Sequence, residues 1–242
     1  MIAPKRFWTE VHVAETPGGF GVRLDARVLR TPAKAELVVP TRALAEAIAA
    51  EWRAVEGEIR PEALPFTRAA NVAVDRIAAD PGPLVAHLAS YGETDLLCYR
   101  AEAPVGLRAR QAAAWDPALA WAARDLGAPL AVTEGVAHRA QDPASLDALR
   151  AAVGAHDAFA LTALSELVTL SGSLVLGLAV ARGGLGAPEA WAASRLDETW
   201  QEEQWGVDDE AAEMARIREN DFLRAARLLE LLADGRGALA QL

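Results

Sequence analysis

The chain has 242 residues, of which 52% are apolar and 24% charged, a composition typical of a folded globular protein and unlike that of a disordered or fibrous one. Its formal net charge of −10 argues against nucleic-acid binding, which depends on clustered cations that displace counterions from phosphate. The single cysteine, Cys98, can form neither an internal disulfide nor a multi-thiolate zinc site. We therefore expect a protein of a reducing cytoplasm.

The first forty residues are predicted to form antiparallel β structure. Apolar residues alternate over 8–13 and 20–24, Gly18-Gly19 is a turn signal, and a further short strand is expected at 37–39. At Thr41, a plausible N-cap, the apolar period changes to that of a helix, which continues to Gly57. A small sheet with one packed helix follows from this pattern.

The rest of the chain is predicted to be mostly helical. The run Asp80-Pro81-Gly82-Pro83 is the strongest interruption. It divides the sequence into a β-rich N-terminal domain, 1–82, and a helical C-terminal domain, 83–242, so the predicted class is α+β. Residues 95–100 are expected to be a strand or an extended connector that returns to the sheet. The expected helices are 66–79, 84–91, 116–127, 143–153, 158–181, 188–205 and 208–232.

The sequence contains neither a recognisable export signal nor a segment long enough to span a membrane. Residues 1–10 lack the apolar run of a signal peptide and are too short for a transit peptide, which again favours a bacterial cytoplasm. The most apolar segment, Leu167–Ala181, has fifteen uncharged residues, whereas a membrane-spanning helix needs about 20. We expect a buried core helix and no membrane insertion.

The sequence offers little to catalysis. With only two lysines, Lys5 and Lys34, it has no lysine-containing phosphate loop, and its four histidines are not spaced as metal ligands. Cys98 lies in an apolar run that favours an inert thiol, and Ser171-Gly172-Ser173 does not occur at a strand-to-helix turn. We therefore predict no catalytic residue, no metal and no cofactor.

The late acidic segment is the strongest candidate for a functional surface. Eight acidic residues and no basic one occur between Asp197 and Glu213. If 188–205 is one helix, a single face carries Trp191, Ser194, Glu198, Gln201 and Trp205. Tryptophans beside a carboxylate are typical of a surface that contacts a partner. The alternative is that both tryptophans pack inward and the acids are merely solvated.

Five short motifs carry a family resemblance that runs from about Phe7 to about Glu213. They are Leu29-Arg30-Thr31-Pro32, Ala49-Ala50-Glu51-Trp52, the run from Thr94 to Arg100, Trp115-Asp116-Pro117, and Gln201 with Trp205-Gly206. In this order they resemble the assembly chaperones for the α subunit of the F-type ATP synthase catalytic head. The resemblance implies a non-enzymatic protein that binds the free α subunit and prevents its aggregation until the β subunit replaces it.

The resemblance also implies a set of partner-binding residues. The family's acidic position falls on Asp197 or Glu198, and Glu198 is favoured because it shares a predicted face with Gln201 and Trp205. The full predicted set is Asp197, Glu198, Gln201, Glu202, Trp205 and Gly206. Three further matched residues are interpreted as structural or as possible partner contacts: Trp52 on an apolar helix stripe, Asp116 as a helix cap, and Asp95 as a cap or a buried carboxylate.

Two other functions remain open on the sequence. An enzyme could use an acidic pair such as Glu198 and Glu202 on a small molecule in an interdomain cleft, which would require an enclosed pocket around those carboxylates. A scaffold for some other basic protein would be distinguished by what it binds.

Overall fold

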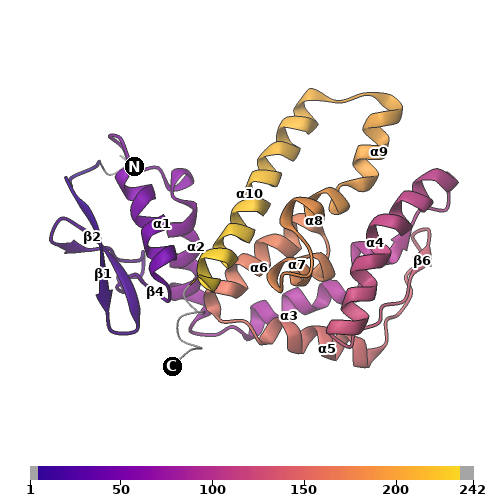
Figure 1. Ribbon diagram of the computed structural model, residues 1–242, viewed down its shortest axis with the longest axis horizontal. Helices are drawn as coiled ribbons and strands as arrows, with labels where there is room; N and C mark the ends of the chain where they lie inside the picture. Colours follow the sequence, from indigo (N-terminus) through magenta and orange to yellow (C-terminus); the bar gives the residue numbers. More distant parts are fainter. Residues whose placement is uncertain (1–4, 235–242) are drawn as a thin grey trace. The chain divides into compact units, whose positions relative to one another are not determined.

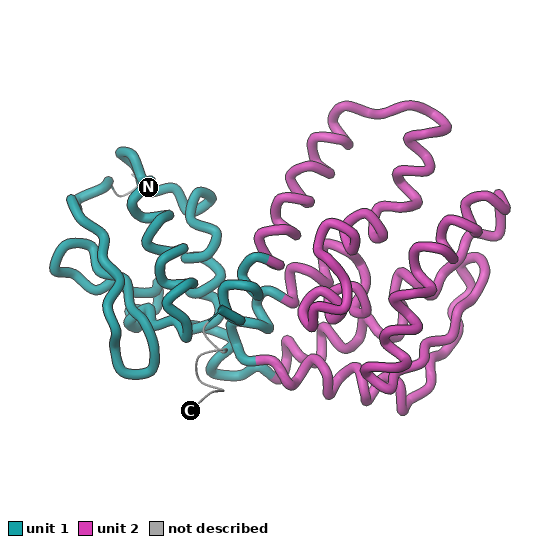
Figure 2. The backbone as a smooth tube through the Cα atoms, in the orientation of Figure 1, with its two compact units in different colours: residues 1–81, 157–163, 227–242 teal, residues 82–156, 164–226 magenta. Residues whose placement is uncertain are grey.

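The computed structural model describes residues 5–234, which form two compact units (Figure 2). Of the described residues, unit 1 contains 5–81, 157–163 and 227–234, and unit 2 contains 82–156 and 164–226. The predicted boundary after residue 82 lies next to residue 81, where the chain first passes from unit 1 to unit 2. The prediction of a single boundary does not include two later segments, which return to unit 1. They return because their apolar side chains complete its core: Ala160, Ala163, Leu228, Leu231 and Leu232.

Unit 1 contains a small antiparallel sheet (Figure 1). Its strands are β1 (Val11–Thr16), β2 (Gly19–Leu24), β3 (Arg27–Val28) and β4 (Val38–Val39). β1 and β2 form a hairpin that pairs Val11 with Leu24, and β2 also pairs with β3 and β4. Gly19 is required in this turn because its φ is 152° and a side chain would collide with the Val39 carbonyl. The predicted β-rich start and the α+β class are confirmed.

Helix α1 (Arg42–Arg53) lies against this sheet and places its apolar stripe in the core. Thr41 is its N-cap: the hydroxyl accepts from the Leu44 amide at 3.2 Å and donates to the Leu231 carbonyl at 2.7 Å. Trp52 is buried, and its indole donates to Thr67 Oγ1 at 3.0 Å. Trp52 is therefore a core residue of unit 1.

A second helical segment follows in unit 1. It comprises a 3₁₀ turn (Pro61–Ala63), α2 (Pro65–Val72) and a π-helical turn, η2 (Ala73–Ile77). The Glu51 carboxylate on α1 accepts from the amides of Phe66 and Thr67 at 2.6 and 2.9 Å, which satisfies two free donors at the start of α2. Burial raises the pKa of Glu51 above its ordinary value.

Unit 2 is almost entirely helical. Its elements are α3 (Gly82–Ser90), η3 (Tyr91–Glu93), η4 (Leu96–Cys98), β5 (Tyr99–Arg100), α4 (Val105–Asp125), β6 (Thr133–Glu134), α5 (Pro143–Gly154), the later part of α6 (Ala158–Ser171), α7 (Leu174–Ala181), α8 (Ala187–Ser194), α9 (Leu196–Trp205) and the first part of α10 (Asp209–Ala233). β5 pairs in parallel with β6. The predicted return of residues 95–100 to the N-terminal sheet is therefore wrong, since their partner strand lies in unit 2.

The predicted helix start at Asp116 is also wrong. α4 begins at Val105 and continues through Pro117, because buried residues on both sides of the proline, Trp115 and Leu119, keep the helix packed. Asp116 is thus no helix cap: its carboxylate accepts from the buried Arg100 guanidinium at 2.7 Å. The proline in the sequence suggested a helix start that tertiary packing overrides.

The predicted single helix over 158–181 is broken in two. Gly172, at a φ of 69°, ends α6, and Ser173 is the N-cap of α7, with its hydroxyl accepting from the Leu176 amide at 3.0 Å. All of Leu174–Ala179 is buried, as expected of a core helix. Within the described residues, no helix combines the length and apolar character needed to cross a membrane.

Asp95 joins this helix break to the preceding chain. It is fully buried, and its carboxylate accepts from Ser173 Oγ at 2.8 Å and from the Val175 and Leu97 amides at 3.0 and 3.1 Å. It therefore caps both η4 and α7. Burial raises the pKa of Asp95 above its ordinary value, although these hydrogen bonds oppose the shift.

We expect Asp95→Asn to lower the free energy of unfolding by about 2 kcal/mol, because the amide NH₂ cannot accept and one buried donor loses its partner. Urea denaturation measures the difference, and Asp147→Asn, at an exposed position in the same unit, is the control, expected within about 0.5 kcal/mol of wild type. Unchanged stability of the Asp95 variant would contradict its capping role.

The stability difference between wild type and the Asp95→Asn variant should also depend on pH. Because the folded-state pKa of Asp95 is raised, the native state binds its proton more tightly than the unfolded chain, and the contribution of Asp95 to stability falls as pH rises above 3.8 towards the folded value. The stability gap between wild type and Asp95→Asn should therefore be wider at about pH 5 than at about pH 8. Denaturation curves at both pH values check the sign.

Candidate functional site

The predicted helix 188–205 is two helices, α8 and α9, divided at Arg195. The Trp115 indole donates to the Ala193 carbonyl at 2.8 Å, and this carbonyl would accept from residue 197 if the helix were continuous. The five residues predicted to share one face therefore do not. Trp191 is 6% exposed and its ring lies 5.6 Å from that of Phe222, whereas Trp205 is 81% exposed.

A buried glutamine attaches α9 to α4. Gln111 donates through Nε2 to Asp197 Oδ1 at 2.7 Å, and its Oε1 accepts from the Ala101 amide at 2.8 Å. Asp197, one of the two residues proposed for the family's acidic position, is thus held by the protein's own α4. Its carboxylate positions the start of α9.

A second contact attaches the middle of α9. The Arg110 guanidinium lies 4.6 Å from the centre of the Trp200 ring and donates to both carboxylate oxygens of Glu203 at 2.7 and 2.8 Å. The Trp200 ring also lies so close to Gly106 that a Cβ there would come within 3.0 Å of it. Together with Gln111, these residues hold α9 along α4.

Helix α9, which carries these attachments, and the first part of α10 form a segment that we call the arm, residues 196–221. All of its residues are described, and none is buried. α10 becomes buried only from Phe222 onward. Figures 1 and 2 show α9 and this part of α10 as two helices joined by a loop at the edge of unit 2.

The arm carries an unusual share of exposed apolar side chains. The described residues contain eight large exposed apolar side chains, and four of them are on the arm: Trp205, Val207, Met214 and Ile217. Trp205 and Val207 lie where α9 ends and the loop begins, and Met214 and Ile217 are one turn apart on α10. Four such side chains within residues 205–217 make the arm the candidate for an association surface.

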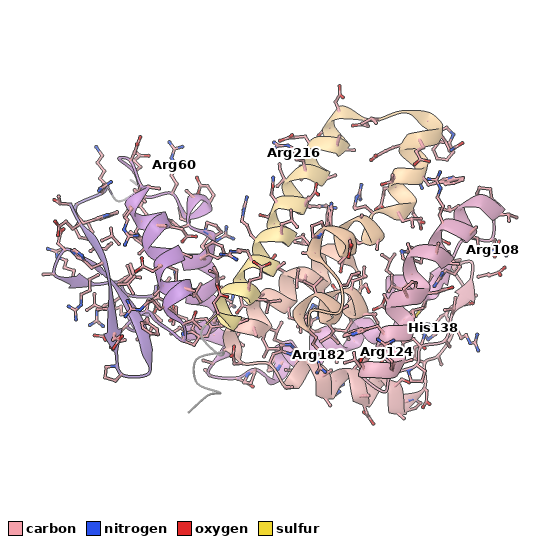
Figure 3. The ribbon with its side chains drawn as sticks, in the orientation of Figure 1. Arg60, Arg108, Arg124, His138, Arg182 and Arg216 are labelled. Atoms are coloured by element: carbon pink, nitrogen blue, oxygen red, sulfur yellow. The ribbon has the colours of Figure 1, made fainter. Side chains whose placement is uncertain are left out.

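The acidic residues between Asp197 and Glu213 fall into two groups. Glu198 and Glu202 lie 2.7 and 3.9 Å from the Arg195 guanidinium, so with Asp197 and Glu203 the acids of α9 face groups of the same chain. Glu213 pairs with Arg216, labelled in Figure 3, and this hydrogen bond lowers the pKa of Glu213.

The second group lies at the start of α10. Asp208 accepts from the Ala211 amide at 2.9 Å and so caps the helix. The carboxylates of Asp209 and Glu210 are exposed, and in the described part of the chain neither forms an ion pair. These three acids follow Trp205 and Val207 directly, so apolar and acidic groups meet at one end of the arm, which we call the tip, residues 205–210.

The other predicted site residues fall in different places. Gln201 is exposed on α9, and Gly206 ends that helix at a φ of 91°, with its amide donating to the Glu202 carbonyl at 2.9 Å. Asp95 and Asp116 are in unit 2 but belong to the contacts described above, and Trp52 is in the core of unit 1. The structure therefore groups only the α9 residues and the tip.

The enzyme alternative requires an enclosed pocket around Glu198 and Glu202. A hollow of about 200 Å³ in unit 2 is lined by residues of α3, η3 and α5, among them Ser90, Glu93 and Arg150, and by neither Glu198 nor Glu202. Burial raises the pKa of the Cys98 thiol to about 12, which makes it a poor nucleophile. Among residues 5–234, no three His, Cys, Asp or Glu side chains are placed to hold a metal ion.

Sequence reasoning missed several residues of the arm and its attachment. Val207, Met214 and Ile217 were absent from the predicted set, although their position next to the acidic run could have indicated them. Arg110 and Gln111 could not be found in this way, because they lie 93 and 86 residues from their partners on α9.

Comparison with known proteins agrees with this fold. Residues 5–123 match the family model described as ATP12 chaperone protein. The crystal structure of Atp12 from Paracoccus denitrificans is 50% identical, with a TM-score of 0.91 over 94% of this chain and 97% of that one. A variant of that protein in which an aspartate is replaced by a lysine matches equally well.

Two more distant relatives also match this chain over most of its length. A protein of Agrobacterium tumefaciens described as a candidate chaperone is 43% identical, with a TM-score of 0.90 over 95% of this chain and 86% of that chain. The mitochondrial protein atp12 of Schizosaccharomyces pombe is 26% identical over 223 residues, which cover 87% of this chain and 76% of the relative. With half of its residues identical to those of P. denitrificans Atp12 over nearly the whole length of both chains, this chain belongs to the Atp12 chaperone family.

Proposed function

We propose that this protein is an assembly chaperone that binds the free α subunit of the F-type ATP synthase catalytic head and prevents its aggregation until the β subunit replaces it. Membership of the Atp12 chaperone family supports the general role, and the resemblance of the sequence motifs supports the α subunit as partner. The proposal includes no catalytic step, and it places the protein in a bacterial cytoplasm.

The observation that carries this proposal is the arm. A stretch of 26 residues in two helices has no buried side chain, yet it holds four large exposed apolar side chains. Helical segments of this length with little packing are marginal in water, and apolar side chains that remain in water gain nothing for the fold. A surface of this kind is stabilised when another polypeptide covers it.

The tip has the chemistry to recognise an apolar surface that also carries basic residues. Trp205 supplies a large aromatic anchor, a residue type enriched among those that dominate binding energy. Asp209 and Glu210 supply negative charge that accelerates encounter with a basic surface. A free α subunit would expose the apolar, arginine-containing surface that it buries against β in the assembled head.

The predicted partner-binding residues take two roles in this proposal. Trp205 and Gly206 belong to the tip, and Gln201 is exposed near it on α9. Glu198 and Glu202 can exchange their bond to Arg195 for one to a basic group of the partner, since their side chains are only half-buried. Asp197 positions α9 through Gln111.

Release follows from relative affinity. The arm offers a small number of anchors, whereas the β subunit would cover the whole of the same surface on α. Binding that is weaker than that of the final neighbour allows displacement without an energy source. The chaperone then needs only to lower the concentration of uncovered α subunit.

Trp205→Ala should weaken binding of purified α subunit about thirtyfold, the effect of removing a strong aromatic anchor. Val136→Ala is the matched control, because Val136 is a fully exposed apolar residue of unit 2 outside the arm. Light scattering of α subunit diluted from denaturant, with each chaperone variant present, gives the readout. Equal suppression by the Trp205 variant and wild type would place the site elsewhere.

Reversal of charge at the tip should act on the rate of binding. We expect the double variant Asp209→Lys, Glu210→Lys to slow association with the α subunit about tenfold at low salt, with a smaller effect at high salt. Glu166→Lys, at an exposed position on α6, is the charge control. Stopped-flow association at two ionic strengths measures both effects, and a salt-independent rate difference would contradict electrostatic attraction.

The attachment of α9 to α4 should be needed for binding although its residues are not part of the tip. We expect Arg110→Glu to weaken binding of the α subunit about threefold by repelling Glu203, and Glu203→Arg in the same chain to restore most of the loss. The hydrogen-exchange rate of the α9 amides should rise in the single variant and return to the wild-type value in the double variant. Failure of the second substitution to rescue either readout would contradict the positioning role.

A further inference from the structure

Unit 1 contains three buried side-chain oxygens that have no hydrogen-bond partner in the described part of the chain. They are Thr31 Oγ1, Asn71 Oδ1 and Asp75 Oδ1. Unpaired buried polar atoms are destabilising, and each one in a folded protein calls for an explanation. Asn71 and Asp75 are one turn apart on the segment formed by α2 and η2, and Thr31 begins a loop that is bonded to this segment, so we look for a single cause.

One contact brings these residues together. The Ala33 amide donates to Asp75 Oδ2 at 3.0 Å and so joins the loop that begins at Thr31 to the π-helical turn η2. Thr31 is two residues before Ala33, and Asn71 is four residues before Asp75, on the same face of the helical segment. π-helical turns are rare and occur frequently at functional sites. Thr31 also belongs to a motif that the arm does not explain.

The three oxygens define the chemistry of a ligand. The amide and carboxylate oxygens of Asn71 and Asp75 can only accept, and the Thr31 hydroxyl can accept as well. Asp75 contributes one negative charge. The nearest arginine of the same loop, Arg30, is engaged with the Lys34 carbonyl at 2.9 Å and with Glu36 at 3.2 Å. No N–H group in the described part of the chain reaches any of the three oxygens, so the set suits a singly charged cation whose several N–H donors come from a ligand.

Entry of such a group requires the contact between Ala33 and Asp75 to open. Thr31 is 4% exposed, but residues 32–36 that follow it are exposed. Breaking the bond from the Ala33 amide frees Asp75 Oδ2, so that both oxygens of this carboxylate can accept from a planar guanidinium fork.

We propose that Thr31, Asn71 and Asp75 form a binding site for the guanidinium group of an arginine side chain. The two oxygens of Asp75 accept from the fork, and Thr31 and Asn71 accept from the remaining N–H groups. That this arginine belongs to the polypeptide held by the chaperone rests on the proposed function; the site itself does not.

The first test uses the full-length protein and a short capped peptide with one arginine. Amide NMR shifts should be confined to residues 31–36 and 71–77, and they should be absent with the same peptide carrying citrulline, which has the shape of arginine without its charge. Asp75→Asn should abolish the shifts, and Glu62→Gln, an exposed position of unit 1, should leave them unchanged. Equal shifts with citrulline, shifts elsewhere only, or no shifts would overturn the site.

The second test separates a ligand site from an internal structural feature. Thr31→Val removes an unpaired hydroxyl with little change of shape, so the midpoint of thermal unfolding should rise by about 2 °C while the arginine peptide binds more weakly. A lower midpoint would show that the hydroxyl is satisfied within the folded chain, and a higher midpoint with unchanged peptide binding would show that it serves no ligand; either result overturns the proposal.

The two proposals fail separately. Wild-type protein that binds the arginine peptide at residues 31–36 and 71–77 but does not suppress aggregation of the α subunit would contradict the proposed function and support the site. Protein that suppresses aggregation but gives no peptide-dependent shift would contradict the site alone.

Discussion

The point at which α10 becomes buried determines the form of the candidate surface. Phe222 is fully buried and contacts Trp191, and further along the helix Leu228, Leu231 and Leu232 lie in the core of unit 1. Burial thus fixes the last three turns of the helix and leaves its first thirteen residues, about 20 Å, without a buried side chain. Ion pairs one turn apart, Glu213 with Arg216 and Asp221 with Arg224, support the helix there.

Much of unit 1 could be predicted because its signals are local. The Gly18-Gly19 turn, the alternation in β1 and β2, and the Thr41 cap are each determined within a few residues. The break at Arg195 could not be predicted, since it depends on an indole 78 residues away that takes the Ala193 carbonyl. The return of 157–163 and 227–234 to unit 1 has the same origin, because periodicity shows which side chains are apolar and not which core they enter.

The residue types of the candidate site could be predicted from the sequence, but not all of the contacts that its acidic residues make within the chain. The run of acids and Trp205 are visible in the sequence, and the structure places Trp205 in water. The contacts of Glu203 with Arg110 and of Asp197 with Gln111 cross long separations in the sequence and could not be predicted. Those of Glu198, Glu202 and Glu213 involve arginines within seven residues and are local. A helical period also grouped Trp191 with Trp205, although one is buried and the other exposed.

The acidity of the arm has a consequence for its apolar side chains. Exposed apolar side chains, here Trp205, Val207, Met214 and Ile217, would favour association between two copies of the same chain. Two such arms brought face to face would juxtapose acidic runs without an intervening base between Asp197 and Glu213, and this repulsion opposes self-association. A basic apolar surface meets no such barrier. In the proposed function, the same carboxylates would both attract a cationic partner and oppose pairing of the arm with itself, so the exposed apolar side chains and the unpaired acids of the arm would act together.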